Sequence, residues 1–295
     1  MKQIKQIFIP GSRWLYIKLY TGYKTADKLL INDISFIIKQ LQKKDIIEKW
    51  FFIRYGDPEF HLRIRLLIKD EIYLGEVINL FFKRLENLVK DNLIWKIQID
   101  TYSRELKRYG NELIEEAESI FFIDSECILS IIKKIDRYKN ENYRWMAALK
   151  LIDYFFNDFS LDLSVRQKLM NEISLSFKTE FGFNQYNSKQ FNGKFRENKK
   201  IIEDVLNNII SDTNFLKLYK PMQKRSKQLL PHIIHLNEKI ENSKENISIN
   251  SLLTSYIHMM VNRLFRSQNR QHELILYDFM YRYYSSELAR RKYNK

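Results

Sequence analysis

The segment His61-Leu62-Arg63-Ile64-Arg65-Leu66 decides how the N-terminal part of this chain is interpreted. With the two-residue period of a β-strand, its leucine and isoleucine side chains share one face, while His61, Arg63 and Arg65 share the other. One face therefore suits a core, and the other carries a row of cations on a rigid element. Arginine presents a planar fork of donors that fits a carboxylate. The alternative is a strand whose second face simply meets water.

The flanking residues predict an ordered alternation of strands and helices. Strands are expected at 14–20, 50–55, 61–68 and 94–99, helices at 26–43 and 71–89, and a turn at 56–59. This βαββαβ order is that of a ferredoxin-like split βαβ unit. The topology makes the first and third strands central and places both helices on one face. Arg63 and Arg65 then point to the opposite face, into a cleft that later helices close.

The rest of the chain has a helical pattern with few breakers. Helices are expected at 111–136, 141–158, 163–179, 195–210, 222–242, 249–266 and 270–290, and the polar segment 182–193 has the strongest loop composition. The predicted fold class is therefore α+β, with an N-terminal ferredoxin-like βαββαβ sheet followed by a mainly helical region packed on it. We expect one domain over residues 1–295, with a sheet-containing part at 1–110 and a helical part at 111–295.

Composition indicates a globular protein with a large core. Of the 295 residues, 45% are hydrophobic and 14% aromatic, which excludes a disordered chain. A single cysteine, Cys127, excludes an internal disulfide framework and favours a reducing compartment. No signal peptide and no stretch near the ~20 apolar residues of a membrane span is present. We therefore expect a soluble, cytoplasmic protein.

The net charge favours an acidic partner without naming it. Lysine and arginine total 50 against 36 acidic residues, for a formal charge of +14. Nucleic acid, an anionic membrane surface and an acidic peptide all fit such an excess. The charges are spread along the chain without a Lys/Arg block, so direct nucleic-acid binding is not expected.

Common cofactor and metal motifs do not occur in the sequence. There is no glycine-rich phosphate loop, no Gly-x-Ser-x-Gly elbow and no His-Glu-x-x-His. His232 and His235 have a spacing that a metal tolerates, but no third ligand is evident. We expect neither a metal nor another cofactor.

Two further stretches carry candidate chemistry. In the segment after the fourth strand, Glu105 and Arg108 are three residues apart, so a helical turn would let them pair. Near the end of the chain, His258 and Asn262 are one helical turn apart beside an apolar stripe, with Arg263 next to them. A histidine bordering such a stripe is more often structural, but a histidine oriented by a neighbour also suits acid–base chemistry.

Together these stretches resemble the lantibiotic dehydratase C-terminal, or glutamate elimination, domain, also known from stand-alone thiopeptide-type bacteriocin biosynthesis proteins. The matching stretches run in family order from about residue 8 to residue 266: Gly11–Tyr16, Tyr20–Gly22, Ala26–Asp27, Trp50–Tyr55, Asp57–Pro58, His61–Arg65, Tyr102–Glu105, Arg108–Gly110, Ala117–Glu118, Phe122, Asp124–Ser125, His258 and Asn262–Leu264. No single motif is specific, but their order and spacing together are.

The resemblance implies a lyase in the maturation of ribosomal peptides. In the family, a separate protein or an N-terminal domain transfers glutamate from glutamyl-tRNA to Ser or Thr of a precursor peptide. The C-terminal domain then expels glutamate and leaves dehydroalanine or dehydrobutyrine. The family associates this step with residues matching Arg63, Arg65, Glu105, Arg108 and His258. Whether His258 acts as base or acid stays open.

Residues within the matching stretches are also expected to bind substrate: Arg54, His61, Tyr102, Asn262 and Arg263. The expected partners are a glutamylated precursor peptide and a separate glutamyl-tRNA-dependent glutamylation protein; a cyclase and a homodimer stay open. Two other functions also stay open. One is a thiopeptide pyridine synthase, which joins two dehydroamino acids by formal [4+2] cycloaddition and releases the leader peptide. The other is a non-catalytic subunit that binds the leader.

Overall fold

A computed structural model describes residues 4–243 and 247–293 of the chain. The fold is α+β, as the sequence predicts. Contacts between Cα atoms divide the chain into two units. The first comprises residues 1–133 and 231–267, and the second comprises 134–230 and 268–295. The division therefore falls within the helical part of the chain. All ten candidate site residues belong to the first unit.

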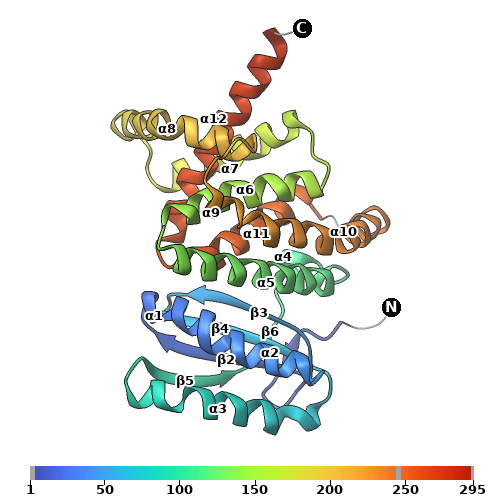
Figure 1. Ribbon diagram of the computed structural model, residues 1–295. Helices are drawn as coiled ribbons and strands as arrows, with labels where there is room; N and C mark the ends of the chain where they lie inside the picture. The colour runs from blue at the N-terminus through green and yellow to red at the C-terminus, as the bar shows by residue number, and fades with distance from the viewer. Residues whose placement is uncertain (1–3, 244–246, 294–295) are drawn as a thin grey trace. The chain divides into compact units, whose positions relative to one another are not determined.

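The first unit contains a four-stranded antiparallel sheet with the order β3-β4-β2-β5 (Figure 1). Its strands are β2 (Trp14–Thr21), β3 (Ile47–Tyr55), β4 (His61–Ile68) and β5 (Ile94–Asp100). The first and third predicted strands, β2 and β4, are the central pair, as expected. A second, two-stranded sheet joins β1 (Ile7–Phe8) to β6 (Tyr102–Ser103).

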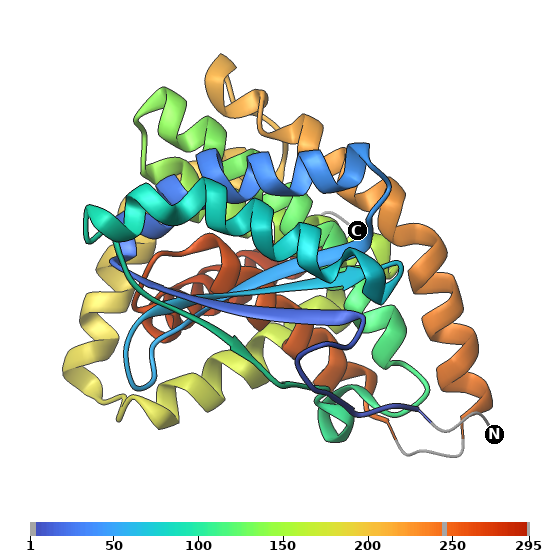
Figure 2. The same cartoon turned by 90° about the horizontal axis from the view of Figure 1, so that it is seen from below.

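Side-chain alternation along β4 separates a core face from a polar face. Leu62, Ile64 and Leu66 are fully buried, while the arginines between them lie on the other side. Helices cover the core face (Figure 2). The helix expected at 26–43 is a continuous run of α1 (Tyr23–Lys28), a π-helical segment (Leu29–Ile34) and α2 (Ser35–Lys43). The second is α3 (Leu74–Lys90), preceded by a 3-10 turn at Glu71–Tyr73.

Side chains of two later helices, α5 (Ile114–Tyr138) and α11 (Ile249–Leu264), form hydrogen bonds with backbone groups on the outer edge of β3. An edge strand presents unpaired backbone groups. Here the Ser125 hydroxyl accepts from the Phe52 amide at 3.3 Å, and Arg263 Nε donates to the Phe52 carbonyl at 2.8 Å. The side-chain amide of Asn262 bonds both backbone groups of Arg54, each at 2.9 Å. Side chains thus take the place of a further strand.

The second unit is helical. Its helices are α6 (Asn142–Asp158), α7 (Leu163–Glu180), α8 (Gln185–Leu206), α9 (Thr213–Leu216) and α12 (Asn269–Tyr293), with the first part of α10 (Tyr219–Asn242). Helices α7 and α12 pack together around the buried Asp278. This carboxylate pairs with Lys178 at 2.5 Å and with Arg282 at 2.6 Å. None of the helices in the described ranges is long and apolar enough to span a membrane.

The loop expected at 182–193 is confined to residues 182–184, because α8 begins at Gln185 and continues through Gly193. Its polar, glycine-bounded composition is typical of a loop, but contacts distant in sequence override that tendency. Asn192 accepts from Arg282 Nη1 of α12 at 2.8 Å, ninety residues away in the sequence. Packing against α12 therefore holds this segment in a helix.

Candidate functional site

The polar face of the sheet is a surface of alternating aromatic and cationic side chains. In the register of β2 and β4, Tyr16 is opposite Arg65 and Lys18 is opposite Arg63. Because opposed residues on antiparallel strands share a face, these four side chains form one surface. The sequence interpretation identified the arginines but missed Tyr16 and Lys18. The same alternation, applied to Trp14–Thr21, would have found both.

Arg65 sits among three aromatic rings. Its guanidinium carbon lies 4.6 Å from the ring centre of Tyr16, 4.8 Å from that of Tyr102 and 5.3 Å from that of Phe51. Burial lowers the pKa of Arg65 from its ordinary value, although an arginine stays charged in proteins. Within residues 4–243 and 247–293, no group accepts a hydrogen bond from Arg65, and its Nε is buried. The arginine is thus rigidly held with its donors unused.

Arg63 is held from two sides. Its guanidinium carbon lies 3.4 Å from the ring centre of Tyr55, and its Nε donates to Nε2 of His61 at 3.0 Å. The other ring nitrogen of His61 lies 2.8 Å from the Glu59 carbonyl, so Nδ1 carries the proton. Because Nε2 accepts from Arg63, the imidazole is neutral in this arrangement, and burial lowers the pKa of His61 from its ordinary value. His61 therefore orients Arg63, and the terminal nitrogens of Arg63 have no acceptor in the described part of the chain.

The remaining cation on β2, Lys18, is already neutralised. It forms an ion pair with Asp100 at the end of β5. The hydrogen bond from Lys18 is the largest of the effects that lower the pKa of Asp100. Lys18 is therefore not available to an added carboxylate, whereas Arg63 and Arg65 form no ion pair among the described residues.

A short helix, α4 (Leu106–Tyr109), follows β6 and carries the predicted Glu105–Arg108 pair. Oε2 of Glu105 lies 3.2 Å from Nε of Arg108, which confirms that the two side chains pair. About half of each side chain is exposed to solvent. Burial lowers the pKa of Arg65 overall, and the negative charge of Glu105 opposes this shift. Next to this pair, the ring of Tyr109 stacks on Tyr256 of α11 at 5.6 Å.

His258 lies half-buried on α11, one turn before Asn262. Residues four apart share a helix face, so His258 lies on the side of α11 whose Asn262 amide bonds Arg54 of β3. Tyr55, the next residue of β3, supports Arg63. His258 therefore lies on the face of α11 that meets the outer edge of β3.

Three of the expected substrate-binding residues are used within the protein. Arg54 is buried. It donates to the Asp27 carboxylate at 2.6 Å and to the Arg263 carbonyl at 3.0 Å. Arg263 is also buried and bonds the β3 backbone, as does Asn262. The bonds between β3 and α11 join residues more than 200 positions apart, so no local pattern reveals them. Of the other two, Tyr102 supports Arg65, and its hydroxyl donates to Glu118 at 2.9 Å.

Asn262→Ala tests whether this residue positions α11 against β3 or binds substrate. The change leaves both backbone groups of Arg54 without their side-chain partner. We expect urea denaturation to give a free energy of unfolding lower by about 1–3 kcal/mol, the cost of unsatisfied polar groups. The control is Asn250→Ala, at an exposed position of the same helix. Unchanged stability with weaker peptide binding would instead assign Asn262 to the substrate.

The histidines considered for metal binding lie elsewhere. His232 and His235 of α10 approach the Glu116 carboxylate, at 2.7 Å and 3.9 Å. In the part of the chain that the structure describes, no three His, Cys, Asp or Glu side chains are placed to hold a metal ion.

The chain is similar to three lantibiotic biosynthesis proteins. It is 26% identical over 281 residues to the subtilin biosynthesis protein SpaB of Bacillus subtilis, covering 92% of this chain and 25% of SpaB. It is 25% identical over 293 residues to the nisin biosynthesis protein NisB of Lactococcus lactis subsp. lactis, covering 95% of this chain and 26% of NisB. The epidermin biosynthesis protein EpiB of Staphylococcus epidermidis is 23% identical over 270 residues, which cover 89% of this chain and 25% of EpiB. The chain thus spans about a quarter of the length of these relatives.

Solved structures share the fold. The tRNA dependent lantibiotic dehydratase MibB from Microbispora sp. 107891 superposes with a TM-score of 0.75 at 18% identity, covering 96% of this chain and 29% of MibB. The pyridine synthase TbtD from thiomuracin biosynthesis gives 0.70 at 11% identity, covering 93% of this chain and 99% of TbtD. Residues 14–284 match the family described as "Lantibiotic biosynthesis dehydratase C-term", and the chain therefore belongs to that family.

Proposed function

We propose that this chain is a lyase that eliminates glutamate from glutamylated Ser or Thr of a ribosomal precursor peptide, giving dehydroalanine or dehydrobutyrine. The observation that carries this proposal is the pair Arg63 and Arg65, fixed on aromatic rings with their terminal donors unused. They are two residues apart on one strand, about 7 Å between Cα atoms. Such a pair is preorganised for an anion that residues 4–243 and 247–293 do not supply.

The elimination has two parts that need different groups. A base removes the Cα proton, the electron pair forms the Cα–Cβ double bond, and the Cβ–O bond breaks so that glutamate leaves as a carboxylate. Negative charge develops on the peptide carbonyl next to Cα and on the departing carboxylate. Fixed cations in a desolvated site stabilise such developing charge with little reorganisation. We assign this role to Arg63, Arg65 and Arg108, and the proton transfer to His258.

A mass-spectrometric assay tests the proposal directly. The purified protein is mixed with a synthetic peptide that carries one glutamyl-serine, and the peptide mass is followed over time. Loss of glutamate with formation of dehydroalanine is expected. Binding without a change in mass would indicate a leader-binding subunit, and a macrocycle with release of the leader would indicate a pyridine synthase.

Within the site, we assign Glu105 to orienting Arg108 rather than to taking the proton. Their contact of 3.2 Å supports this role. Glu105→Gln is expected to retain more elimination activity than Arg108→Ala, because an amide oxygen still accepts from the guanidinium. Initial rates of glutamate release from the same peptide measure both effects. The reverse ranking would make Glu105 a candidate base.

The pyridine synthase stays the second candidate because TbtD is matched over 99% of its own length. Elimination is favoured by the structural superpositions, in which the identity to the lantibiotic dehydratase MibB is 18% against 11% for TbtD. The free arginine pair supports the same choice, since cycloaddition of two dehydroamino acids presents no glutamate carboxylate to hold.

The glutamylation step requires a partner in this proposal. The relatives SpaB, NisB and EpiB are about four times longer than the matched region. We propose that residues 1–295 act together as one elimination domain, with a ferredoxin-like sheet that the order β3-β4-β2-β5 supports. A separate glutamyl-tRNA-dependent protein would supply the glutamylated peptide, so this chain itself need not bind tRNA.

A further inference from the structure

A cavity of about 390 Å³ opens in the first unit beside the arginine face. This volume is within the range of small-ligand pockets, about 300–1,000 Å³. Its apolar walls come from both sheets and the N-terminal segment: Ile4, Phe8, Trp14 and Leu67. Phe8 and Trp14 are almost fully buried, so they form fixed walls.

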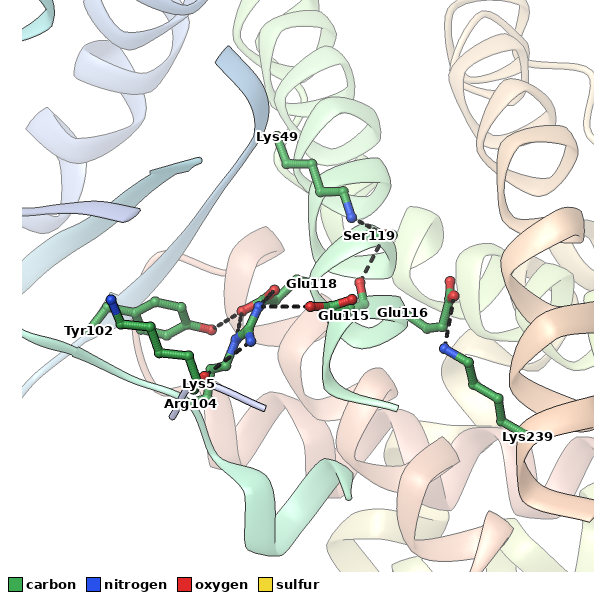
Figure 3. Close-up of polar contacts among 9 residues, drawn as sticks. All are labelled: Lys5, Lys49, Tyr102, Arg104, Glu115, Glu116, Glu118, Ser119 and Lys239. Atoms are coloured by element: carbon green, nitrogen blue, oxygen red, sulfur yellow. Dashed lines mark hydrogen bonds and ion pairs between the residues drawn. The ribbon is translucent and has the colours of Figure 1, made fainter. Parts of the chain in front are cut away.

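The floor of the cavity is a closed polar network (Figure 3). Arg104 donates to both carboxylate oxygens of Glu118, at 2.8 Å and 2.7 Å, and to the Lys5 carbonyl at 3.1 Å. The Tyr102 hydroxyl donates to the same carboxylate at 2.9 Å. Because every group of this floor has a partner, it fixes the shape of the cavity rather than attracting a ligand.

Two lysines of the lining supply unneutralised charge. Lys49 Nζ donates to the Ser119 hydroxyl at 2.6 Å, and Lys5 Nζ lies 5.0 Å from the ring centre of Phe8 (Figure 3 shows both lysines). Neither forms an ion pair with a carboxylate among residues 4–243 and 247–293. By contrast, each acid of the lining faces an arginine: Glu48 pairs with Arg13, and Glu115 and Glu118 face Arg104. The cavity therefore favours an anionic ligand.

The cavity and the arginine face lie along the same strands. Leu67 is two residues beyond Arg65 on β4, and Trp14 is two residues before Tyr16 on β2, so the separation is about 7 Å. The ring of Tyr102 lies 4.8 Å from Arg65 and 5.3 Å from Trp14. An extended peptide advances about 3.3–3.6 Å per residue, so a peptide centred at Arg65 has its second or third neighbour at the cavity.

We propose that this cavity is a subsite for the precursor peptide, binding an aromatic side chain and an adjacent carboxylate two or three residues from the modified Ser or Thr. The inference rests on the proposed elimination at the arginine face. The aromatic side chain packs against Phe8, Trp14 and Leu67, and the carboxylate pairs with Lys5 and Lys49. The subsite thus selects which hydroxyl residue of a precursor reaches the arginines.

Binding of unmodified peptides tests the subsite without any elimination chemistry. A fluorescein-labelled peptide with one serine and a Phe-Asp pair two residues away is titrated with the full chain, and anisotropy gives its dissociation constant. The comparison peptide has Ala-Asn in place of Phe-Asp. We expect the Phe-Asp peptide to bind about tenfold more tightly, with the difference shrinking as salt rises.

Charge-altered variants then locate the binding. Lys49→Glu and Lys5→Glu are each expected to weaken binding of the Phe-Asp peptide about three- to tenfold. Glu115→Lys, at a half-exposed position of the lining, is expected to strengthen it, a gain that misfolding cannot produce. Lys24→Glu on the exposed side of α1 is the matched control and should leave the affinity unchanged.

Photo-crosslinking provides a second, direct observation. Replacing the phenylalanine of the peptide by benzoylphenylalanine should yield crosslinks to Phe8, Trp14 or Leu67, identified by mass spectrometry. Crosslinks elsewhere, together with unchanged affinities in the three lining variants, would overturn the subsite. The two proposals fail separately: a wild-type protein that binds and crosslinks as expected but releases no glutamate contradicts only the elimination, whereas glutamate release that ignores the flanking residues contradicts only the subsite.

Discussion

Arg63→Ala and Arg65→Ala are each expected to lower glutamate release about 100- to 1,000-fold, so that the glutamylated peptide accumulates. This is the magnitude lost when one preorganised donor is removed from a site that stabilises developing anionic charge. Each arginine stacks on aromatic rings and has terminal donors that nothing else in the described residues uses. Single-turnover release of glutamate, followed by mass spectrometry, measures the loss.

Two further variants separate the loss of charge from the loss of packing. Arg65→Met fills much of the space between Tyr16, Tyr102 and Phe51, so its activity should fall with little change in stability. Arg65→Lys keeps the charge without the two-pronged geometry and should remain a poor enzyme. The control is Arg84→Ala on α3, whose guanidinium pairs with Asp33 at 2.7 Å on the helical side of the sheet. Wild-type rates in both arginine-to-alanine variants of β4 would remove this face from the mechanism.

The position of these arginines could be predicted because the information is local. A two-residue period is a property of the strand itself, so His61–Leu66 specifies its two faces without knowledge of the rest of the fold. The same rule, applied to Trp14–Thr21, also gives Tyr16 and Lys18. The sequence interpretation found no chemistry in that strand because a single lysine among aromatic residues has no distinctive pattern.

Contacts between distant segments could not be predicted in the same way. Arg54 and Arg263 belong to stretches that resemble the family, and both were expected to bind substrate. Their hydrogen bonds join β3 to α11 across more than 200 residues, and both side chains are buried. The cavity has the same origin, because its walls come from the N-terminal segment, the sheet and α5. The segment 182–193 shows the limit of composition, since packing on α12 decides its helical state.

His258→Ala is expected to bind the glutamylated peptide normally and to release glutamate about 100- to 10,000-fold more slowly. Positioned acid–base groups contribute rate factors of this order. The assignment depends on placement: His258 shares the face of α11 on which Asn262 bonds the backbone of Arg54, next to Tyr55 and Arg63. His235→Ala is the control, because this exposed histidine lies on α10 near Glu116.

The chemistry favours a base over an acid for His258. A carboxylate leaving group hardly needs a proton, whereas the peptide Cα–H is a weak acid whose removal needs both a base and cations that hold the resulting charge. Replacing His258 or one of the arginines should therefore lower the rate of glutamate release by orders of magnitude. Because the groups act as a unit, the rate factor lost in the double variant should be far smaller than the product of the two single losses. Hydrogen–deuterium exchange at Cα of the bound peptide distinguishes the two roles. If His258 is the base, the exchange disappears in His258→Ala. If His258 is the acid, the exchange stays intact in this variant and only the departure of glutamate is slowed.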